Sequence, residues 1–371
     1  MNDRTIHRFV VKIGSSVLTD HHGYLLPARV GQLVEQVVAC LSASAPQPII
    51  VSSGAVACGM AKLGLSARPN ALAQLQACAA IGQSELMHLY TTAFSQHQTL
   101  TAQVLLTQED LASPKRYTNA KQTLLTLLHR RVVPIVNEND TVAVEEITFG
   151  DNDRLAALVA SAVDADLLVI LSDVDGFLQD GKPVERIETL QSLRREVLPG
   201  AKRRTTVGGM DSKLEAARIV GHSGIPMIIA NGTRPGILTE LLAGKPVGTL
   251  FVPPRTRLTA RKWWLAFALR QPKGAVVIDE GAADALTEQG KSLLPSGIRQ
   301  VRGEFAAGEF VTVLNRAGHE VARGVCAFSS SELMRVLGLN SAEAARVLGH
   351  PKAREAIHRD RLVLAKELQA H

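Results

Sequence analysis

Short apolar runs alternate with longer mixed segments over the first 260 residues of the chain. Each run is mostly apolar and rich in Val, Ile and Leu, which is typical of a parallel strand that is buried on both faces. The runs predict strands at Arg8–Ile13, Ile49–Val51, Gln103–Leu106, Val132–Val136, Leu167–Leu171 and Pro226–Ala230. The segments between them predict helices, among them Pro27–Ser42, Lys115–Arg130 and Asp153–Val163. The pattern therefore predicts an α/β fold, a three-layer αβα sandwich around a mostly parallel sheet.

The pattern changes after Pro253-Pro254, where short strands and frequent glycines replace the alternation. Strands are predicted at Ala275–Asp279, Ile298–Arg302, Phe310–Asn315 and Glu320–Cys326, with a helix at Ala282–Gln289. A chain of 371 residues exceeds the usual size of one hydrophobic core. We therefore expect a first domain over residues 1–260, a linker over 261–272, and a small β-rich barrel with a helical tail over 273–371.

Composition narrows the class of protein only a little. Lys and Arg exceed Asp and Glu by 41 to 35, an excess too small to indicate a nucleic-acid-binding protein. The four cysteines are scattered and the eleven histidines lack metal-ligand spacing, so we expect no disulfide, no metal site and a cytoplasmic protein. No apolar run approaches the length of a membrane span, so no membrane contact is expected.

The first chemical signal is the segment Lys12-Ile13-Gly14-Ser15, at the end of a predicted strand. Burying a lysine is costly unless an anion accompanies it. Gly14 and Ser15 supply backbone N–H groups that could hold phosphate. An edge strand with its lysine in solvent is the alternative, and this segment alone leaves that open.

Polar residues also follow two other predicted strands. Ser53 and Gly54 come after one, and the sequence Asn137-Glu138-Asn139-Asp140 comes after another. A second polar cluster, Asp151-Asn152-Asp153, precedes a predicted helix. The segment Ser53-Gly54 suits a helix start that binds an anion through its free N–H groups, and a tight turn with a serine cap is the alternative. Turn formation explains either of the other two clusters singly, but together those two favour a polar pocket that recognises an amino group as well as a carboxylate.

Two further segments lie at the end of a strand or the start of a helix, and the second of them suits a nucleotide phosphate. Ser172-Asp173 closes a strand, and Gly208-Gly209-Met210-Asp211-Ser212-Lys213 opens a helix with a lysine about one turn in. The glycine spacing differs from a Walker A loop, which excludes that class of site.

In this order, the five segments resemble the amino-acid kinase family, and the stretch from Ser292 to Gly324 resembles a PUA domain. The resemblance implies three catalytic residues, Lys12, Lys213 and Asp153, with the aspartate holding the lysines. It implies an acceptor site made of Ser53, Gly54, Asn137, Asp140, Asp151 and Asn152. It implies an ATP site made of Lys12, Gly14, Ser15, Ser172, Asp173, Val207, Gly208, Gly209, Met210, Asp211, Ser212 and Lys213. Val207 stands where the family usually has Thr.

Members that join these two domains phosphorylate the side-chain carboxylate of L-glutamate with ATP and Mg²⁺, the first step of proline biosynthesis. The resemblance thus implies direct in-line transfer without a covalent enzyme intermediate, a homo-oligomer, and a glutamyl-phosphate reductase as partner. Two alternatives stay open. One is a related kinase for N-acetylglutamate, aspartate or a nucleoside monophosphate; the other is an RNA-binding protein that acts through its C-terminal module.

Overall fold

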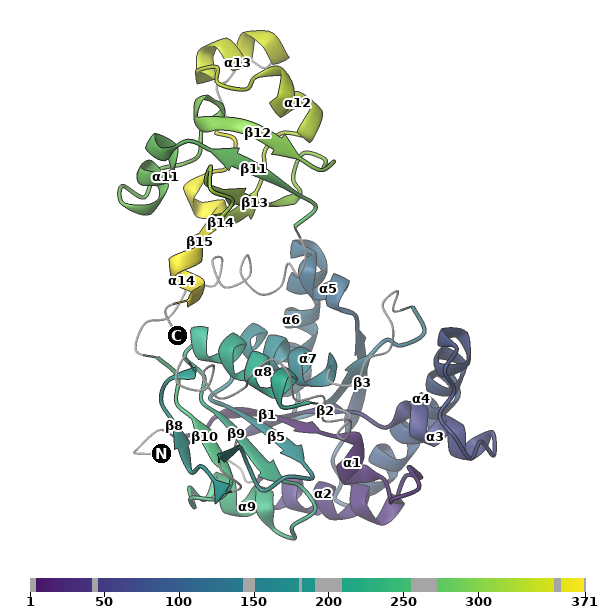
Figure 1. The fold of residues 1–371 in the computed structure, drawn as a ribbon. Helices are drawn as coiled ribbons and strands as arrows, with labels where there is room; N and C mark the ends of the chain where they lie inside the picture. Colours follow the sequence, from purple (N-terminus) through teal and green to yellow (C-terminus); the bar gives the residue numbers. More distant parts are fainter. Residues whose placement is uncertain are drawn as a thin grey trace. The chain divides into compact units, whose positions relative to one another are not determined.

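The computed structural model describes residues 5–41, 46–142, 151–179, 182–190, 209–254, 272–349 and 355–369. The chain divides into two compact units, Met1–Arg257 and Leu258–His371, which are coloured purple to green and green to yellow in Figure 1. Each unit has its own sheet and its own hydrophobic core.

The first unit is built on an eight-stranded sheet of order β3-β4-β2-β1-β5-β9-β10-β8. The strands are β1 (Arg8–Ile13), β2 (Gln47–Ser52), β3 (Thr101–Leu106), β4 (Val133–Glu138), β5 (Leu167–Ser172), β8 (Arg186–Ile187), β9 (Met227–Asn231) and β10 (Thr249–Phe251). The six strands from β3 to β9 are parallel, and β10 pairs antiparallel with β9. A separate hairpin joins β6 (Leu178–Gln179) to β7 (Lys182–Pro183). The predicted mostly parallel sheet is confirmed.

Helices cover both faces of this sheet (Figure 1). The helices are α1 (Ser15–Leu18), α2 (Pro27–Ala39), α3 (Ala55–Lys62), α4 (Leu72–Ser95), α5 (Gln108–Ala112), α6 (Pro114–His129), α7 (Asp151–Ala162), α8 (Met210–His222) and α9 (Ile237–Leu242). On one face, α2, α4 and α9 share a core with β1, to which Phe9 and Val11 contribute. On the other face lie α7 and α8. The predicted three-layer arrangement is confirmed.

Helices α3 and α4 follow Gly54 and pack against each other. Their backbones pack in direct contact: a Cβ on Gly59 would lie 1.9 Å from the Cys78 carbonyl oxygen, and one on Gly82 would lie 1.8 Å from that of Ala55. The glycines therefore allow a close approach that a hydrophobic periodicity does not reveal.

The order of the strands fixes where the site lies. After β1 the chain forms β2, β3 and β4, which all lie on one side of β1. It then returns to form β5 on the other side of β1. Ligands of open α/β sheets bind beyond the carboxyl ends of the strands where the order reverses. In this sheet the reversal lies between β1 and β5, so the ends at Ile13 and Ser172 flank it.

The second unit contains a five-stranded sheet of order β12-β11-β13-β14-β15. Its strands are β11 (Gly274–Ile278), β12 (Ile298–Arg302), β13 (Phe310–Leu314), β14 (Glu320–Val325) and β15 (Leu362–Leu364). Its helices are α11 (Glu280–Thr287), α12 (Ser330–Arg335), α13 (Ser341–Leu348) and α14 (Ala365–Gln369), with 3₁₀ turns η3 (Pro295–Gly297) and η4 (Arg359–Arg361). The tail is thus not wholly helical. Strand β15 pairs antiparallel with β14, and its residues Leu362 and Val363 are buried.

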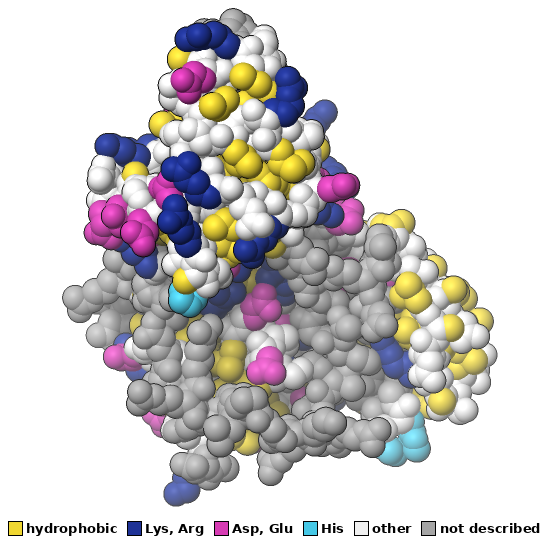
Figure 2. All heavy atoms as spheres, turned by 45° about the horizontal axis from the view of Figure 1, so that its top comes forward, with side chains coloured by type: hydrophobic (Ala, Val, Ile, Leu, Met, Phe, Trp, Pro, Cys, Tyr) yellow, Lys and Arg dark blue, Asp and Glu magenta, His cyan; other side chains and the backbone are white. Residues whose placement is uncertain are grey.

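Basic and acidic side chains are interspersed on the second unit, in the face that Figure 2 presents. Arg299 forms an ion pair with Asp279, and Arg323 forms one with Glu320. Each of these two positive charges therefore has a carboxylate beside it, while both arginine side chains stay partly exposed.

All four cysteines are free thiols in the structure. Across the ranges that the structure describes, no helix combines the length and the apolar character that crossing a membrane requires.

Candidate active site

Three charged side chains meet beside the carboxyl end of β1. Lys12 Nζ lies 2.6 Å from Asp153 Oδ1, and Lys213 Nζ lies 3.3 Å from Asp153 Oδ2. The lysines come from β1 and α8, and the aspartate comes from the first turn of α7. All three are buried, so one carboxylate lies between two ammonium groups and leaves one positive charge uncompensated among the three. This excess charge favours an anion.

Burial and charge act in opposite directions on these groups. Burial raises the pKa of Asp153, but the neighbouring Lys12 and Lys213 ammonium groups outweigh it, so the net pKa lies below the usual range. Burial lowers the pKa of Lys12, and Asp153 offsets this only in part. Asp153 is therefore ionised at neutral pH, while Lys12 holds its proton less firmly than an exposed lysine does.

Two further contacts fix Asp153. Ser212 Oγ lies 2.8 Å from both Asp153 Oδ2 and the Gly209 carbonyl oxygen, and the charged carboxylate is the stronger acceptor of its single proton. Next to Asp153, the buried Arg154 forms an ion pair with Glu215, which ties α7 to α8. Ser212, which the sequence assigns to ATP, thus contacts the aspartate.

Amide and hydroxyl groups gather on the β2 and β4 side of this triad. Asn152 Nδ2 donates to Ser53 Oγ at 2.9 Å and to Asn137 Oδ1 at 3.1 Å. Asn137 Nδ2 in turn donates to Gln83 Oε1 of α4 at 2.8 Å. Asn152 and Asp153 are adjacent in α7, so this amide cluster begins directly beside the lysine–aspartate triad.

The other acceptor-side residues lie around this cluster. Gly54 has φ +112°, a conformation that favours glycine, and it precedes α3. Asp140 lies close enough to Arg68 to raise the pKa of that guanidinium, although burial lowers it more strongly. Asp151 begins α7, and its side chain lies outside the described residues.

The opposite side of the triad follows β5. Ser172 Oγ donates to Asp173 Oδ1 at 3.0 Å, and the Asp173 carboxylate acts electrostatically on Lys12. The Gly14 amide donates to the Leu171 carbonyl at 3.1 Å, so that N–H already has a partner within the sheet. A Cβ on Gly14 would lie 3.2 Å from the Leu171 carbonyl oxygen, so the backbone approaches the end of β5 closely at this glycine. Ser15 begins the short helix α1.

The glycine-rich segment leads into α8. Gly209 is its N-cap, and Met210, Asp211 and Ser212 form its first turn before Lys213. Asp211 is exposed, whereas Lys213 is buried. Val207 and Gly208, which the resemblance places at ATP, lie outside the described residues.

Comparison with known families agrees with this arrangement. The model of the amino acid kinase family matches residues 7–231, more than half of the chain, and that of the PUA domain matches residues 274–348. The chain belongs to the amino acid kinase family. The family match includes β1, β2, β4, β5 and α8, which contribute the residues described above.

Curated relatives span nearly the whole chain. A glutamate 5-kinase of Geobacter sulfurreducens is 46% identical over 366 residues, covering 97% of this chain and 98% of the relative. A glutamate 5-kinase of Thermus thermophilus is 46% identical over 367 residues, with the same coverage. One of Caldanaerobacter subterraneus is 44% identical over 364 residues, covering 96% and 97%. A solved UMP kinase of Bacillus anthracis aligns at 15% identity and a TM-score of 0.46, over 69% of this chain and all of that chain, and supports no conclusion here.

An amino acid kinase uses ATP, and the donor set limits how a metal ion could be held. No cluster of three or more His, Cys, Asp or Glu residues suited to a metal occurs within the described ranges. Both oxygens of Asp153 face lysines, which leaves the exposed Asp173 as the carboxylate at the end of β5. This set fits Mg²⁺, which is commonly held by one or two carboxylates together with substrate phosphates.

Several contacts in this kinase site have no signal in the motifs. Gln83 lies in the middle of α4, far in sequence from the polar clusters. Only the preceding Gly82 distinguishes it from the other polar residues of that helix. The Arg154–Glu215 pair is likewise hidden among ordinary helix charges. These residues reach the site through helix packing, which sequence periodicity does not specify.

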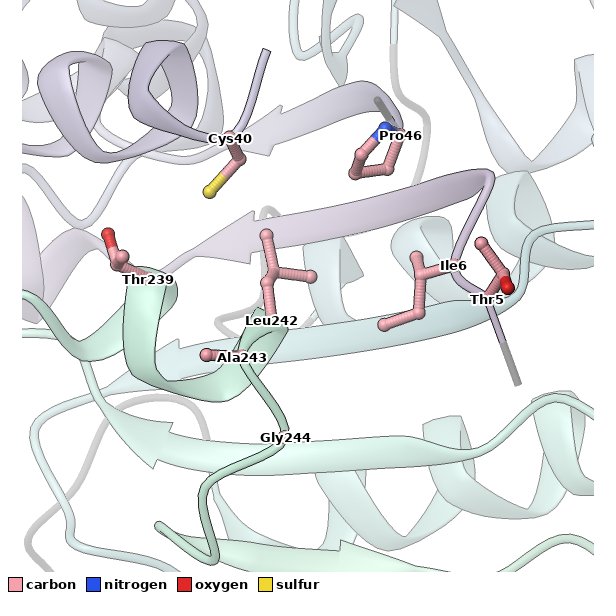
Figure 3. Close-up of a pocket in the computed structure, with 8 residues that line it drawn as sticks. All are labelled: Thr5, Ile6, Cys40, Pro46, Thr239, Leu242, Ala243 and Gly244. Atoms are coloured by element: carbon pink, nitrogen blue, oxygen red, sulfur yellow. The ribbon is translucent and has the colours of Figure 1, made fainter. Parts of the chain in front are cut away.

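A cavity of about 470 Å³ lies away from this site (Figure 3). Thr5 and Ile6, which precede β1, and Leu242 of α9 are among the residues that line it. It is therefore at the amino end of β1, opposite the end that carries Lys12, and it holds no cluster of charged groups.

Proposed function

We propose that this chain phosphorylates the side-chain carboxylate of L-glutamate with ATP. Relatives near 46% identity over almost the full length are named glutamate 5-kinase, which supports the choice of glutamate. The arrangement of Lys12, Asp153 and Lys213 between an amide-rich cluster and the end of β5 is the observation that carries the proposal.

The acceptor needs no general base. A glutamate side chain has a pKa of about 4.3, so its carboxylate is already ionised and nucleophilic at neutral pH. The two phosphoryl-transfer partners, however, are both anions. At a separation of about 4 Å and an effective dielectric constant near 20, each pair of like charges repels by about 4 kcal/mol. Catalysis therefore depends on positive charge placed where the anions meet.

Lys12 and Lys213 supply that charge. Both ammonium groups lie within 3.3 Å of the same carboxylate, so their positions are fixed before any substrate arrives. Charges that are already oriented in a buried site need little reorganisation in the transition state, where they stabilise the transferring phosphoryl group. The transfer is direct and in line, without a covalent enzyme intermediate.

Asp153 has a positioning role in this proposal. Because it accepts from Ser212 and pairs with both lysines, it has no free oxygen directed at a nucleophile. It keeps two like charges together at a distance that they would otherwise not tolerate.

A Mg²⁺ ion chelated by ATP would supply positive charge to the phosphate oxygens. Asp173 is the residue of this chain that we assign to it. The remaining nucleotide contacts are assigned to Ser15, Ser172 and the segment Val207–Lys213. Gly14 lies at the same strand end, but its N–H donates to Leu171, so it is not assigned as a phosphate donor.

The amide-rich cluster is assigned to glutamate. Ser53, Asn137 and Asn152 form a hydrogen-bonded cluster of uncharged groups next to Asp153, and Asp140 follows β4 with Arg68 nearby. Gly54 and Asp151 complete the assigned pocket. A pocket of this kind can recognise both the ammonium and the carboxylate of an amino acid.

The chemistry of the product implies further steps. γ-Glutamyl phosphate is an acyl phosphate that hydrolyses in water, so we propose that a reductase consumes it in proline biosynthesis. We also propose a homo-oligomer, and a reducing compartment such as the cytoplasm, which four free thiols favour.

A coupled ADP-release assay in Mg²⁺ tests the choice of substrate. Glutamate, N-acetylglutamate, aspartate and UMP are compared at equal concentrations, and the proposal expects turnover with glutamate far above the others. A rate with glutamate no higher than the rate with ATP alone overturns it.

A further inference from the structure

Gln83 is a buried polar side chain that the proposed chemistry does not use. It is 9% exposed and lies in α4, whose other buried residues include Leu86 and Tyr90. The glycine before it, Gly82, brings α4 against the backbone of α3. This close packing places Gln83 within reach of Asn137, at the end of β4.

The orientation of the Asn137 amide follows from one backbone contact. The Glu138 N–H donates to Asn137 Oδ1 at 2.9 Å, and a backbone N–H can only donate. Asn137 Nδ2 must therefore face Gln83, which presents its own Oε1 as acceptor at 2.8 Å. Gln83 and the Glu138 amide thus hold the two ends of the Asn137 side chain.

The same logic extends to Asn152. Because Asn137 Oδ1 is an acceptor, Asn152 must offer it Nδ2, and the second hydrogen of that amide goes to Ser53 Oγ. Asn152 Oδ1 is left as the opposite end of the amide. It is buried and has no hydrogen-bond partner among the described residues.

A buried acceptor without a partner is uncommon in folded proteins and calls for a ligand that donates. Gln83 Nε2 is likewise buried and unpartnered within the described part of the chain. The hydrogen-bonded cluster therefore has an unpaired acceptor, Asn152 Oδ1, at the end next to Asp153, and an unpaired donor, Gln83 Nε2, at the other end.

We propose that Gln83 is a positioning residue, which fixes the amides of Asn137 and Asn152 so that Asn152 Oδ1 accepts a hydrogen bond from the α-ammonium group of the substrate. This inference rests on the proposed function, and it adds a determinant of specificity. Gln83 does not contact the substrate itself. It fixes the orientation of the Asn152 amide, which does.

The test compares glutamate with glutarate, which has the same carboxylates but no α-ammonium group. Gln83→Met retains side-chain volume and removes the acceptor for Asn137. The matched control is Gln74→Met, on the exposed side of the same helix. Gln83→Glu retains an acceptor at the same place.

In Gln83→Met, kcat/KM for glutamate should fall about 10- to 100-fold, the range for a lost hydrogen bond that leaves a buried group unpaired. The value for glutarate should fall much less, so the preference for glutamate shrinks, while the KM for ATP stays unchanged. Gln83→Glu should retain the preference, and Gln74→Met should behave as wild type.

An equal loss for glutamate and glutarate would mean that Gln83 only packs the helix, and it would overturn the inference but not the proposed function. Turnover of glutamate by wild type separates the two, since its absence overturns both. If Gln83→Met does not fold, Gln83→Ala carries the same expectation.

Discussion

Lys12 Nζ lies 2.6 Å from Asp153 Oδ1, with the lysine 6% exposed and the aspartate fully buried. Asp153 also pairs with Lys213, so a single carboxylate organises both buried ammonium groups.

Asp153→Asn should destabilise the fold by about 3 kcal/mol at neutral pH, because two buried lysines lose their partner. The pKa of Asp153 is held below its ordinary 3.8, so its stabilisation is present above that pH and is lost as the pH falls through the lowered value. Urea unfolding should therefore show a difference from wild type that narrows toward acid pH. Asp284→Asn, at an exposed position, is the control. Equal stability of Asp153→Asn and wild type at neutral pH would contradict the account.

Lys213→Ala should lower kcat by about 10²- to 10³-fold, the cost of removing one preorganised group that stabilises transition-state charge. The KM for glutamate should change far less, since the side chain acts on the phosphoryl group. Steady-state kinetics measure both constants. Lys245→Ala, an exposed lysine 60% accessible in its side chain, should leave them unchanged. An unchanged kcat in Lys213→Ala would remove this residue from the catalytic role.

The activity should fall at alkaline pH because Lys12 acts as an ammonium group. Burial lowers the pKa of Lys12 below 10.5, so kcat/KM for ATP, which reports the free enzyme, should decline at a pH below that value. Bound phosphate favours the charged form, so the decline in kcat at saturating ATP should move to higher pH. Rate measurements between neutral and alkaline pH give the alkaline decline, or limb, of kcat/KM for ATP and that of kcat. Coincident limbs at or above pH 10.5 would contradict the assignment.

Gly82→Ala should destabilise the first unit by about 1–3 kcal/mol, since extra volume in a packed interface forces the backbone apart. A Cβ there would lie 1.8 Å from the Ala55 carbonyl oxygen. Gly31→Ala in α2 has open space and should be neutral or stabilising by up to about 1 kcal/mol. Urea unfolding of the two variants compares them directly, and equal stability would mean that α3 and α4 are not in close contact.

The sequence predicts the sheet well because strand burial leaves a direct signal. The run Phe9-Val10-Val11 is apolar without interruption because both faces of β1 are covered, and the structure places β1 in the middle of the sheet. The change from apolar to polar residues at Ser53 and Asn137 marks the carboxyl ends of β2 and β4. By contrast, the tail strand β15 has only three residues, too few for a periodicity to emerge.

The parts of the site that the motifs do not reveal are those that come from helix packing. Gln83 reaches Asn137 because Gly59 and Gly82 allow two helices to touch, and no periodicity encodes that contact. Ser212 lies in a motif typical of nucleotide sites, yet it contacts Asp153. A motif thus predicts that a residue lies near the site, but the packing of the helices determines which side chain that residue contacts.

The transfer of phosphate to the glutamate side chain is tested most directly by trapping the product. The purified protein is incubated with ATP, Mg²⁺, glutamate and hydroxylamine, which converts an acyl phosphate to a stable hydroxamate. The account predicts γ-glutamyl hydroxamate in a one-to-one ratio with ADP, measured by mass spectrometry. ADP release without hydroxamate, or a hydroxamate formed at the α-carboxylate, would contradict it.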